Sequence, residues 1–154
     1  MPIPPYIQAL RNDIGHRLIL TPGVTAVVFD DAGRVLLGER ADSGRWALPA
    51  GVMEPGEQPA ETIVREVYEE TAVHIEPERV VSVLTQPVTT CPNDDLVQYV
   101  DITFRCRAVG GEARVNDEES LAVGWFALDD MPPVGDLGKH RIECALSPGT
   151  WFAV

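Results

Sequence analysis

Three glutamates near the middle of the chain have the residue type and the spacing of a metal-binding site. Glu66, Glu69 and Glu70 lie in a run from Pro59 to Thr71 that is predicted to be a helix with proline at its first position. At spacings of three and four residues the carboxylates share one helix face, where like charges oppose helix formation by about 0.2–0.5 kcal/mol per pair. Carboxylate oxygens are preferred ligands of Mg²⁺ and related cations. The cluster therefore indicates a divalent-cation site, with a solvated acidic helix face as the alternative.

Another face of the same helix is apolar and predicts how the helix packs. Its side chains fall within an arc of roughly 100°, which is the width of a core-facing stripe. The helix follows directly on a loop rich in glycine and proline, whose backbone can approach a ligand and present carbonyl oxygens to it. We therefore expect the loop and the helix to form one pocket. The predicted stripe consists of Ala60, Ile63, Val64, Val67 and Thr71.

The segment from Gly51 to Val73 resembles the Nudix box, Gly-x5-Glu-x7-Arg-Glu-U-x-Glu-Glu-x-Gly-U, in which U is a bulky apolar residue. The departure is Ala72, which stands where the box has its last glycine and which we expect to extend the helix by one residue. WALPAG at 46–51 and GWFALDDMP at 124–132 resemble two further elements of that family, so the resemblance covers residues 24 to about 133. The matching box positions are Gly51, Glu57, Arg65, Glu66, Val67, Glu69, Glu70 and Val73.

The resemblance implies an α/β fold of the Nudix type, an α/β/α sandwich around a mixed sheet in which the box forms a loop-helix-loop. The length of 154 residues is typical of one domain, so we expect one Nudix domain over residues 1–154, with residues 1–16 as a helical extension. Propensity and patterning predict helices at 5–14, 59–71 and 137–146, a hairpin from strands 24–29 and 35–38, and strands at 79–84, 96–106 and 124–126.

Carried over by position, the resemblance implies that Glu66, Glu69 and Glu70 are catalytic and bind the metal, with Mg²⁺ as the expected ion and Mn²⁺ as the alternative. Glu66 acting on the attacking water is an alternative role. Ala50 keeps the backbone carbonyl that the family directs at a metal, provided that its φ is negative. Arg65 is expected to hold the carboxylates in place by bidentate hydrogen bonds, with Glu57 as a second support.

Many family members add one more carboxylate, as base or ligand, from a loop just before the tryptophan-phenylalanine pair. Asp117, Glu118 and Glu119 are available here, and the spacing to Trp125 favours Glu119. Ordinary loop acids are the alternative interpretation. Residues outside the box would hold the nucleobase, since bases stack on aromatic side chains. The aromatic candidates are Tyr6, Trp46, Tyr99 and Phe104, each of which could equally be a core residue.

The implied activity is Mg²⁺-dependent hydrolysis of the phosphoanhydride bond in a nucleoside diphosphate linked to another moiety. An ADP-ribose or nucleotide-sugar substrate is ranked first, because Pro87 resembles a weak marker of ADP-ribose enzymes. A nucleoside triphosphate pyrophosphatase that clears unwanted nucleotides is the second hypothesis. A non-catalytic ligand sensor on the same fold is the third, and the intact glutamates argue against it.

Composition restricts the partners of the chain. The net charge of −12 repels a phosphate backbone, so a nucleic-acid polymer is not an expected partner, whereas a small phosphorylated molecule can bind through a cation. No apolar run reaches the ~18 residues of a membrane span, and the N-terminus does not resemble a targeting segment, so we expect no membrane association and a cytoplasmic protein. The three widely spaced cysteines are expected to be free thiols. Family habit suggests a homodimer.

Overall fold

Residues 3–154 are described by the structure, a computed structural model, and they form three helices and nine strands. Residues 1 and 2 of the expected N-terminal extension lie outside this range. The helices are α1 (Pro5–Ile14), α2 (Pro59–Thr71) and α3 (Gly135–Leu146). The strands are β1 (Ile19–Phe29), β2 (Val35–Arg40), β3 (Trp46–Ala47), β4 (Ala50–Val52), β5 (Val73–Thr85), β6 (Thr89–Thr90), β7 (Leu96–Gly111), β8 (Ser120–Phe126) and β9 (Trp151–Phe152).

The strands form one mixed sheet, which confirms the predicted fold class. Its main path runs β3-β2-β1-β7-β5-β9, while β4 pairs with β1, β6 with β7 and β8 with β2. The central pair, β1 and β7, is parallel over its whole length, from Ile19 opposite Val97 to Phe29 opposite Arg107. The predicted hairpin of β1 and β2 is present, closed by the pair Phe29 and Val35.

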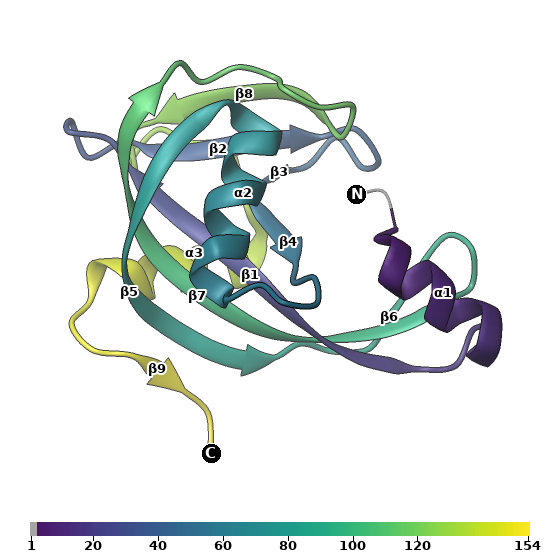
Figure 1. Cartoon of the computed structure of the whole chain (residues 1–154). Helices are drawn as coiled ribbons and strands as arrows, with labels where there is room; N and C mark the ends of the chain where they lie inside the picture. The colour runs from purple at the N-terminus through teal and green to yellow at the C-terminus, as the bar shows by residue number, and fades with distance from the viewer. Residues whose placement is uncertain (1–2) are drawn as a thin grey trace.

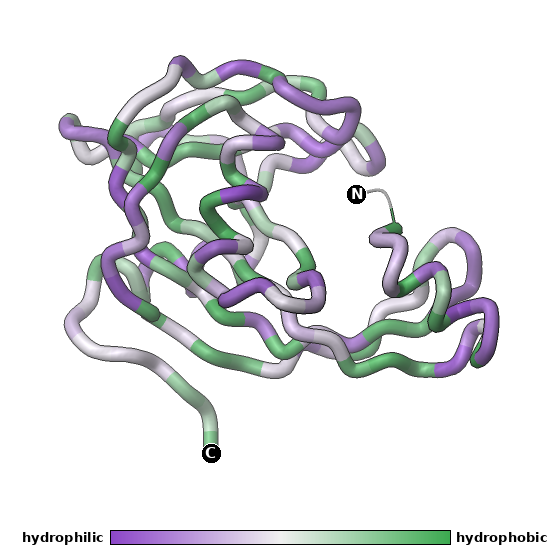
Figure 2. Tube along the Cα trace, in the orientation of Figure 1, coloured by the Kyte–Doolittle hydropathy of each residue, from purple (hydrophilic) through white to green (hydrophobic). Residues whose placement is uncertain are grey.

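Side chains that alternate along β1 build two cores, one on each face of the sheet. Val24, Ala26 and Val28 pack with α2 on one face, and Val27 and Phe29 pack with α3 on the other. Figure 1 shows the two helices on opposite faces of the sheet, and Figure 2 shows α2 alternating between hydrophobic and hydrophilic residues along its turns. The layers are therefore helix, sheet and helix, as the resemblance implied.

Helix α1 packs against an arm of the sheet that extends beyond α2 (Figure 1). Arg11, in α1, is 9% exposed and donates from Nη2 to the carbonyl of Leu96 at 2.8 Å, while its Nε lies 3.4 Å from a carboxylate oxygen of Asp95. A buried guanidinium needs such partners, because an unpaired buried charge is costly. Arg11 therefore fixes α1 to the start of β7.

Three strands, β1, β5 and β8, begin earlier than their sequences predict, and two of them contain proline. β1 includes Pro22 and Gly23, and β5 includes Pro77, although these residues usually interrupt strands. The register of β5 against β7 shifts between Pro77 and Arg79, and such a bulge tolerates a residue that cannot donate a ladder hydrogen bond. Pairing with β7 thus overrides the local preference at both places.

Candidate active site

The helix that carries the three glutamates begins and ends with defined contacts. At its start, Pro59 occupies the first turn and the carboxylate of Glu61 accepts a hydrogen bond from the N–H of Gln58 at 2.8 Å. At its end, Ala72 adopts a left-handed conformation, with φ of 60° and ψ of 15°, and donates to the carbonyl of Tyr68 at 2.8 Å. The expectation that Ala72 extends the helix was therefore wrong. Alanine takes the conformation that glycine would take, which costs about 1–2 kcal/mol.

The buried face of α2 differs from the predicted stripe at one position. Val64 is 39% exposed, whereas Thr62 and Glu66 are buried at 0% and 5% exposure. The buried face is thus rotated toward the residues that contact the loop before the helix, and the expectation that Val64 packs in the core was wrong. A carboxylate lies in that interface instead.

Arg65 connects the helix to the preceding loop and to two of the glutamates. Its Nε and Nη2 donate to the two oxygens of Glu57 at 2.6 and 2.9 Å, which is a bidentate pair. Its Nη1 donates to Glu66 at 2.9 Å and to Glu69 at 3.2 Å. Arg65 thus has the contacts that a support for carboxylates requires.

Glu57 anchors the glycine- and proline-rich loop to α2. Its Oε2 accepts hydrogen bonds from the N–H of Glu54 at 3.0 Å and from the Thr62 hydroxyl at 2.7 Å. The hydrogen bond from Arg65 is the main cause that lowers the pKa of Glu57 to about 2, so this carboxylate stays charged. Hydrogen bonds therefore join the loop to the helix.

The carboxylate of Glu66 lies against the backbone of Gly51 in β4. A Cβ atom at residue 51 would lie 2.1 Å from the Glu66 Cδ, so only glycine leaves room for this side chain. Burial raises the pKa of Glu66 to about 7, against the opposing effect of Arg65. The close approach of β4 to α2 therefore places a carboxylate that can gain or lose a proton near neutral pH.

Glu70 lies where α2, β4 and the loop between β7 and β8 meet. Burial raises its pKa to about 8, and the negative charges of Glu66 and Asp117 act in the same direction. The backbone of Ala50 hydrogen-bonds to this carboxylate and lowers its pKa, as does the charge of Arg40. Glu70 and Ala50, two of the predicted metal ligands, are thus neighbours although they come from different elements.

The loop between β7 and β8 covers the C-terminal end of α2. The Arg114 N–H donates to the carbonyl of Thr71 at 3.0 Å, and the Asn116 side chain donates to the carbonyl of Tyr68 at 2.9 Å. These contacts explain why Asp117 reaches Glu70. Glu119, which the spacing favoured, is half-buried and donates its N–H to the Asp117 carboxylate at 3.0 Å.

The donor atoms of the predicted metal site fit a hard divalent cation. Ala72 and Asp94 are the non-glycine residues with positive φ within residues 3–154, so Ala50 meets the condition set for its carbonyl. Within the same residues no three His, Cys, Asp or Glu side chains converge as a preformed metal centre, and Glu69, with its side chain 53% exposed, pairs with Arg65 instead. Carboxylate and carbonyl oxygens are nonetheless the ligands that Mg²⁺ and Mn²⁺ prefer, and a cation would relieve the repulsion that Glu66 and Asp117 add to the effect of burial on Glu70.

The structure separates the four aromatic candidates. Phe104 is 7% exposed in the core under α2, and Trp46 stacks edge-on against Phe126 in the other core. Tyr6 is 54% exposed on α1. Tyr99 is half-buried, and its pKa is raised by burial and lowered by the charge of Arg40, which also acts on Glu70. Tyr99 is therefore the candidate that shares a charged neighbour with the acidic site.

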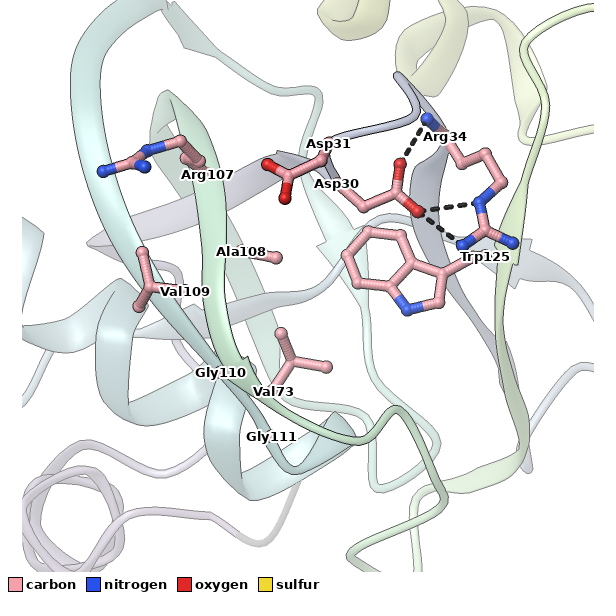
Figure 3. A pocket seen from close by; sticks show the side chains of 10 residues that line it. All are labelled: Asp30, Asp31, Arg34, Val73, Arg107, Ala108, Val109, Gly110, Gly111 and Trp125. Atoms are coloured by element: carbon pink, nitrogen blue, oxygen red, sulfur yellow. Dashed lines mark hydrogen bonds and ion pairs between the residues drawn. The ribbon is translucent and has the colours of Figure 1, made fainter.

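A cavity of about 480 Å³ lies apart from the predicted site residues (Figure 3). Figure 3 shows the Trp125 ring near the ion pair of Asp30 and Arg34 at one end of it. None of the predicted metal ligands lines this cavity, so it is separate from the acidic site. Its lining consists of Asp30, Asp31, Arg34, Val73, Arg107, Ala108, Val109, Gly110, Gly111 and Trp125.

The raised pKa values of Glu66 and Glu70 predict how the stability of the metal-free protein depends on pH. Between their ordinary pKa of 4.5 and about 8, the folded state holds protons that the unfolded state has released. The free energy of unfolding should therefore fall as pH rises through this window, by up to about 1.4 kcal/mol per pH unit for each proton held.

Thermal unfolding in EDTA from pH 5 to pH 8.5 measures this effect, and Tm should fall toward high pH. The Glu66→Gln/Glu70→Gln double variant should lose much of that fall, and Mg²⁺ at pH 8 should restore part of the wild-type Tm. The same pH profile in wild type and double variant would contradict the placement of the two carboxylates.

Comparison with known proteins identifies the class of the protein. The NUDIX domain profile matches residues 19–145, so the chain belongs to the Nudix family and the resemblance is confirmed. A MutT-like protein of Streptomyces ambofaciens is 36% identical over 108 residues, which cover 70% of this chain and 64% of that protein. The human 8-oxo-dGDP phosphatase NUDT18 is 36% identical over 135 residues, which cover 84% of this chain and 37% of that protein.

A solved structure supports the fold. The crystal structure of an ADP-ribose pyrophosphatase from Streptococcus suis 89-1591 superposes with a TM-score of 0.64 at 29% identity, over 85% of this chain and 96% of that chain. The chain spans less than two thirds of the length of each of these two relatives. No helix within residues 3–154 is both long and apolar enough to cross a membrane.

Proposed function

We propose that the protein is a Nudix hydrolase that uses Mg²⁺ or Mn²⁺ to cleave the phosphoanhydride bond of a nucleoside diphosphate linked to another moiety. The array in which Arg65 holds Glu57, Glu66 and Glu69 beside a Glu70 of raised pKa carries this proposal. The carbonyl of Ala50 and the carboxylates of Glu66, Glu69 and Glu70 would hold the metal ion. When bound, a divalent ion supplies electrostatic stabilisation of the diphosphate oxygens.

The protein groups have separate parts in the proposed reaction. Water attacks a phosphorus of the diphosphate, a new P–O bond forms, and the bridging P–O bond breaks to release a nucleoside monophosphate and a second phosphorylated product or pyrophosphate. A glutamate takes the proton of the water, and Glu66 would fill this role if it acts on the water instead of binding the metal. Arg65 orients the carboxylates, and Asp117 or Glu119 adds a negative group from the loop.

ADP-ribose or a nucleotide sugar is the substrate class that we rank first. Pro87 and the similarity to the Streptococcus suis ADP-ribose pyrophosphatase support it. The similarity to the human 8-oxo-dGDP phosphatase supports the second candidate, a nucleoside triphosphate pyrophosphatase or a related enzyme that clears nucleotides. We also propose that residues 1–154 act as one domain with residues 1–16 as an extension, in a cytoplasmic homodimer.

A substrate panel tests the proposal. The protein is incubated with ADP-ribose, UDP-glucose, the four dNTPs and 8-oxo-dGDP in Mg²⁺, in Mn²⁺ and in EDTA, and nucleoside monophosphate release is measured by chromatography. We expect metal-dependent turnover with the highest kcat/KM for ADP-ribose or UDP-glucose. Preference for a dNTP or for 8-oxo-dGDP would support nucleotide clearing, and binding without turnover of any compound would support a ligand sensor.

A further inference from the structure

Arg40 is fixed beside the loop that carries the acidic residues. It is the last residue of β2 and lies opposite Ser120, the first residue of β8, at a point where the register of the two strands shifts. The N–H of the next residue, Ala41, donates to the carbonyl of Glu119 at 2.8 Å. The backbone at Arg40 is therefore tied to the segment that contains Asp117 and Glu119.

The guanidinium of Arg40 is held by one carboxylate and still has unused hydrogen-bond donors. Its Nε and Nη2 donate to the two carboxylate oxygens of Asp42 at 3.0 and 2.7 Å, and its side chain is 57% exposed. A guanidinium has five N–H donors, so this pair leaves the Nη1 group with no hydrogen-bond acceptor within residues 3–154. The pair with Asp42 fixes Nε and Nη2, so Nη1 is the part of the group that is available to a ligand.

The charge of Arg40 acts on two groups of the candidate site. Its guanidinium interacts electrostatically with the carboxylate of Glu70 and with the hydroxyl of Tyr99. Arg65, the other arginine of the site, already binds three carboxylates. Arg40 is thus a cation with free donors beside the acidic cluster.

We propose that Arg40 binds the diphosphate of the substrate through its Nη1 group. It thereby contributes to substrate affinity together with the metal-binding carboxylates. The proposal rests on the proposed function and names a residue for substrate recognition. A diphosphate approaching a protein of net charge −12 and a cluster of glutamates needs a compensating cation. Arginine suits this task because Nη1 keeps two N–H donors for phosphate oxygens while Nε and Nη2 stay on Asp42, whereas lysine provides a point charge. Asp42 is the positioning residue that holds the fork.

Arg34 provides a matched control at the opposite end of the same strand. It precedes β2, and its guanidinium pairs with Asp30 through Nε and Nη2, both at 2.7 Å, with the side chain 50% exposed. The two arginines therefore have the same kind of partner and similar exposure, but among residues 3–154 Arg34 is not one of the main charges that act on Glu70 or Tyr99. Arg34→Gln removes one positive charge from the protein, as Arg40→Gln does.

The test compares Arg40→Gln, Arg40→Lys and Arg34→Gln with wild type. With the preferred substrate of the panel and saturating Mg²⁺, Arg40→Gln should raise KM about 10–100-fold with a smaller change in kcat, since a hydrogen bond to a charged group is lost. Arg40→Lys should fall between Arg40→Gln and wild type, and Arg34→Gln should stay within about twofold of wild type. Calorimetric titration with ADP and Mg²⁺ should show the same order of Kd values.

The outcomes distinguish the role of Arg40 in binding from the proposed hydrolase activity. A wild type that turns over no compound contradicts the enzyme activity, and the ADP titration then decides the role of Arg40 by itself. Equal Kd values for wild type and Arg40→Gln, equal losses in Arg40→Gln and Arg34→Gln, or no binding of ADP to wild type would each overturn the proposal.

Discussion

Glu70→Gln should reduce kcat/KM by about 10²–10⁴-fold, the range expected when a general base or an equally placed charged group is removed. Glutamine keeps the shape of the side chain and loses the charge. The backbone of Ala50 and the charges of Glu66 and Asp117 all act on the Glu70 carboxylate, so this group is coupled to several parts of the proposed site. Activity is measured with the best substrate at saturating Mg²⁺.

The same variant should remain folded and become slightly more stable without metal, because the repulsion from Glu66 and Asp117 disappears. Its Tm in EDTA at pH 8 should exceed that of wild type. Glu61→Gln is the control on the same helix, since glutamine can also accept the hydrogen bond from the N–H of Gln58. Glu61→Gln should keep wild-type activity. Turnover by Glu70→Gln within a few-fold of wild type would refute the assignment of the site.

Gly51→Ala should displace the Glu66 carboxylate and cost activity as well as stability. The added Cβ would lie 2.1 Å from Cδ and 2.3 Å from Oε1 of Glu66, which is 5% exposed and held by Arg65. Forcing an extra carbon into such a packed contact costs typically about 1–3 kcal/mol. We expect a loss of that size in denaturant unfolding, together with at least a 10²-fold loss of kcat/KM.

Two control variants make this prediction specific. Gly38→Ala places a methyl group in β2, where the nearest atom, the Ser120 hydroxyl oxygen, is 3.6 Å away, so stability should change little. In a Glu66→Ala background the clashing atoms are absent, and Gly51→Ala should then cost much less than it does in wild type. Additive losses in the double variant would show that Gly51 acts through something other than Glu66.

The helices and the register of the glutamates could be predicted because both depend on local signals. Pro59 at the first turn and the spacing of Ile63 and Val67 fix the start and the buried side of α2. The extent of β1 and β5 could not be predicted, because Pro22 and Pro77 are tolerated only through pairing with β7, a strand distant in sequence. Tertiary contacts override propensity in such segments.

The composition of the site could be predicted in part. The box indicated Arg65 and its carboxylates, and the structure gives Arg65 these contacts. The approach of Ala50 and Asp117 to Glu70 depends on how β4 and the loop after β7 pack on α2, which residue spacing does not encode. Val64 was misassigned because the contact of Gly51 with the helix shifts its buried face.

Arg40 carried no signal in the sequence, because it lies outside the segment that resembles the Nudix box. Its relation to Glu70 and Tyr99 follows from the pairing of β2 with β8 and from the position of β7. Residues that recognise a ligand from outside a motif become visible only once such pairings are known.

The parallel pairing of β1 with β7 has a consequence for synthesis of the chain. β1 leaves the ribosome about 80 residues before the strand that completes its hydrogen-bond ladder, and at about 5–20 residues per second it waits several seconds for that partner. During this interval a nascent segment that includes Val24 to Phe29, apolar on both faces, has no β7 to cover its edge. Pairing with β2 covers only the opposite edge of β1, so folding of this protein is expected to depend on protection of the edge that receives β7 during translation.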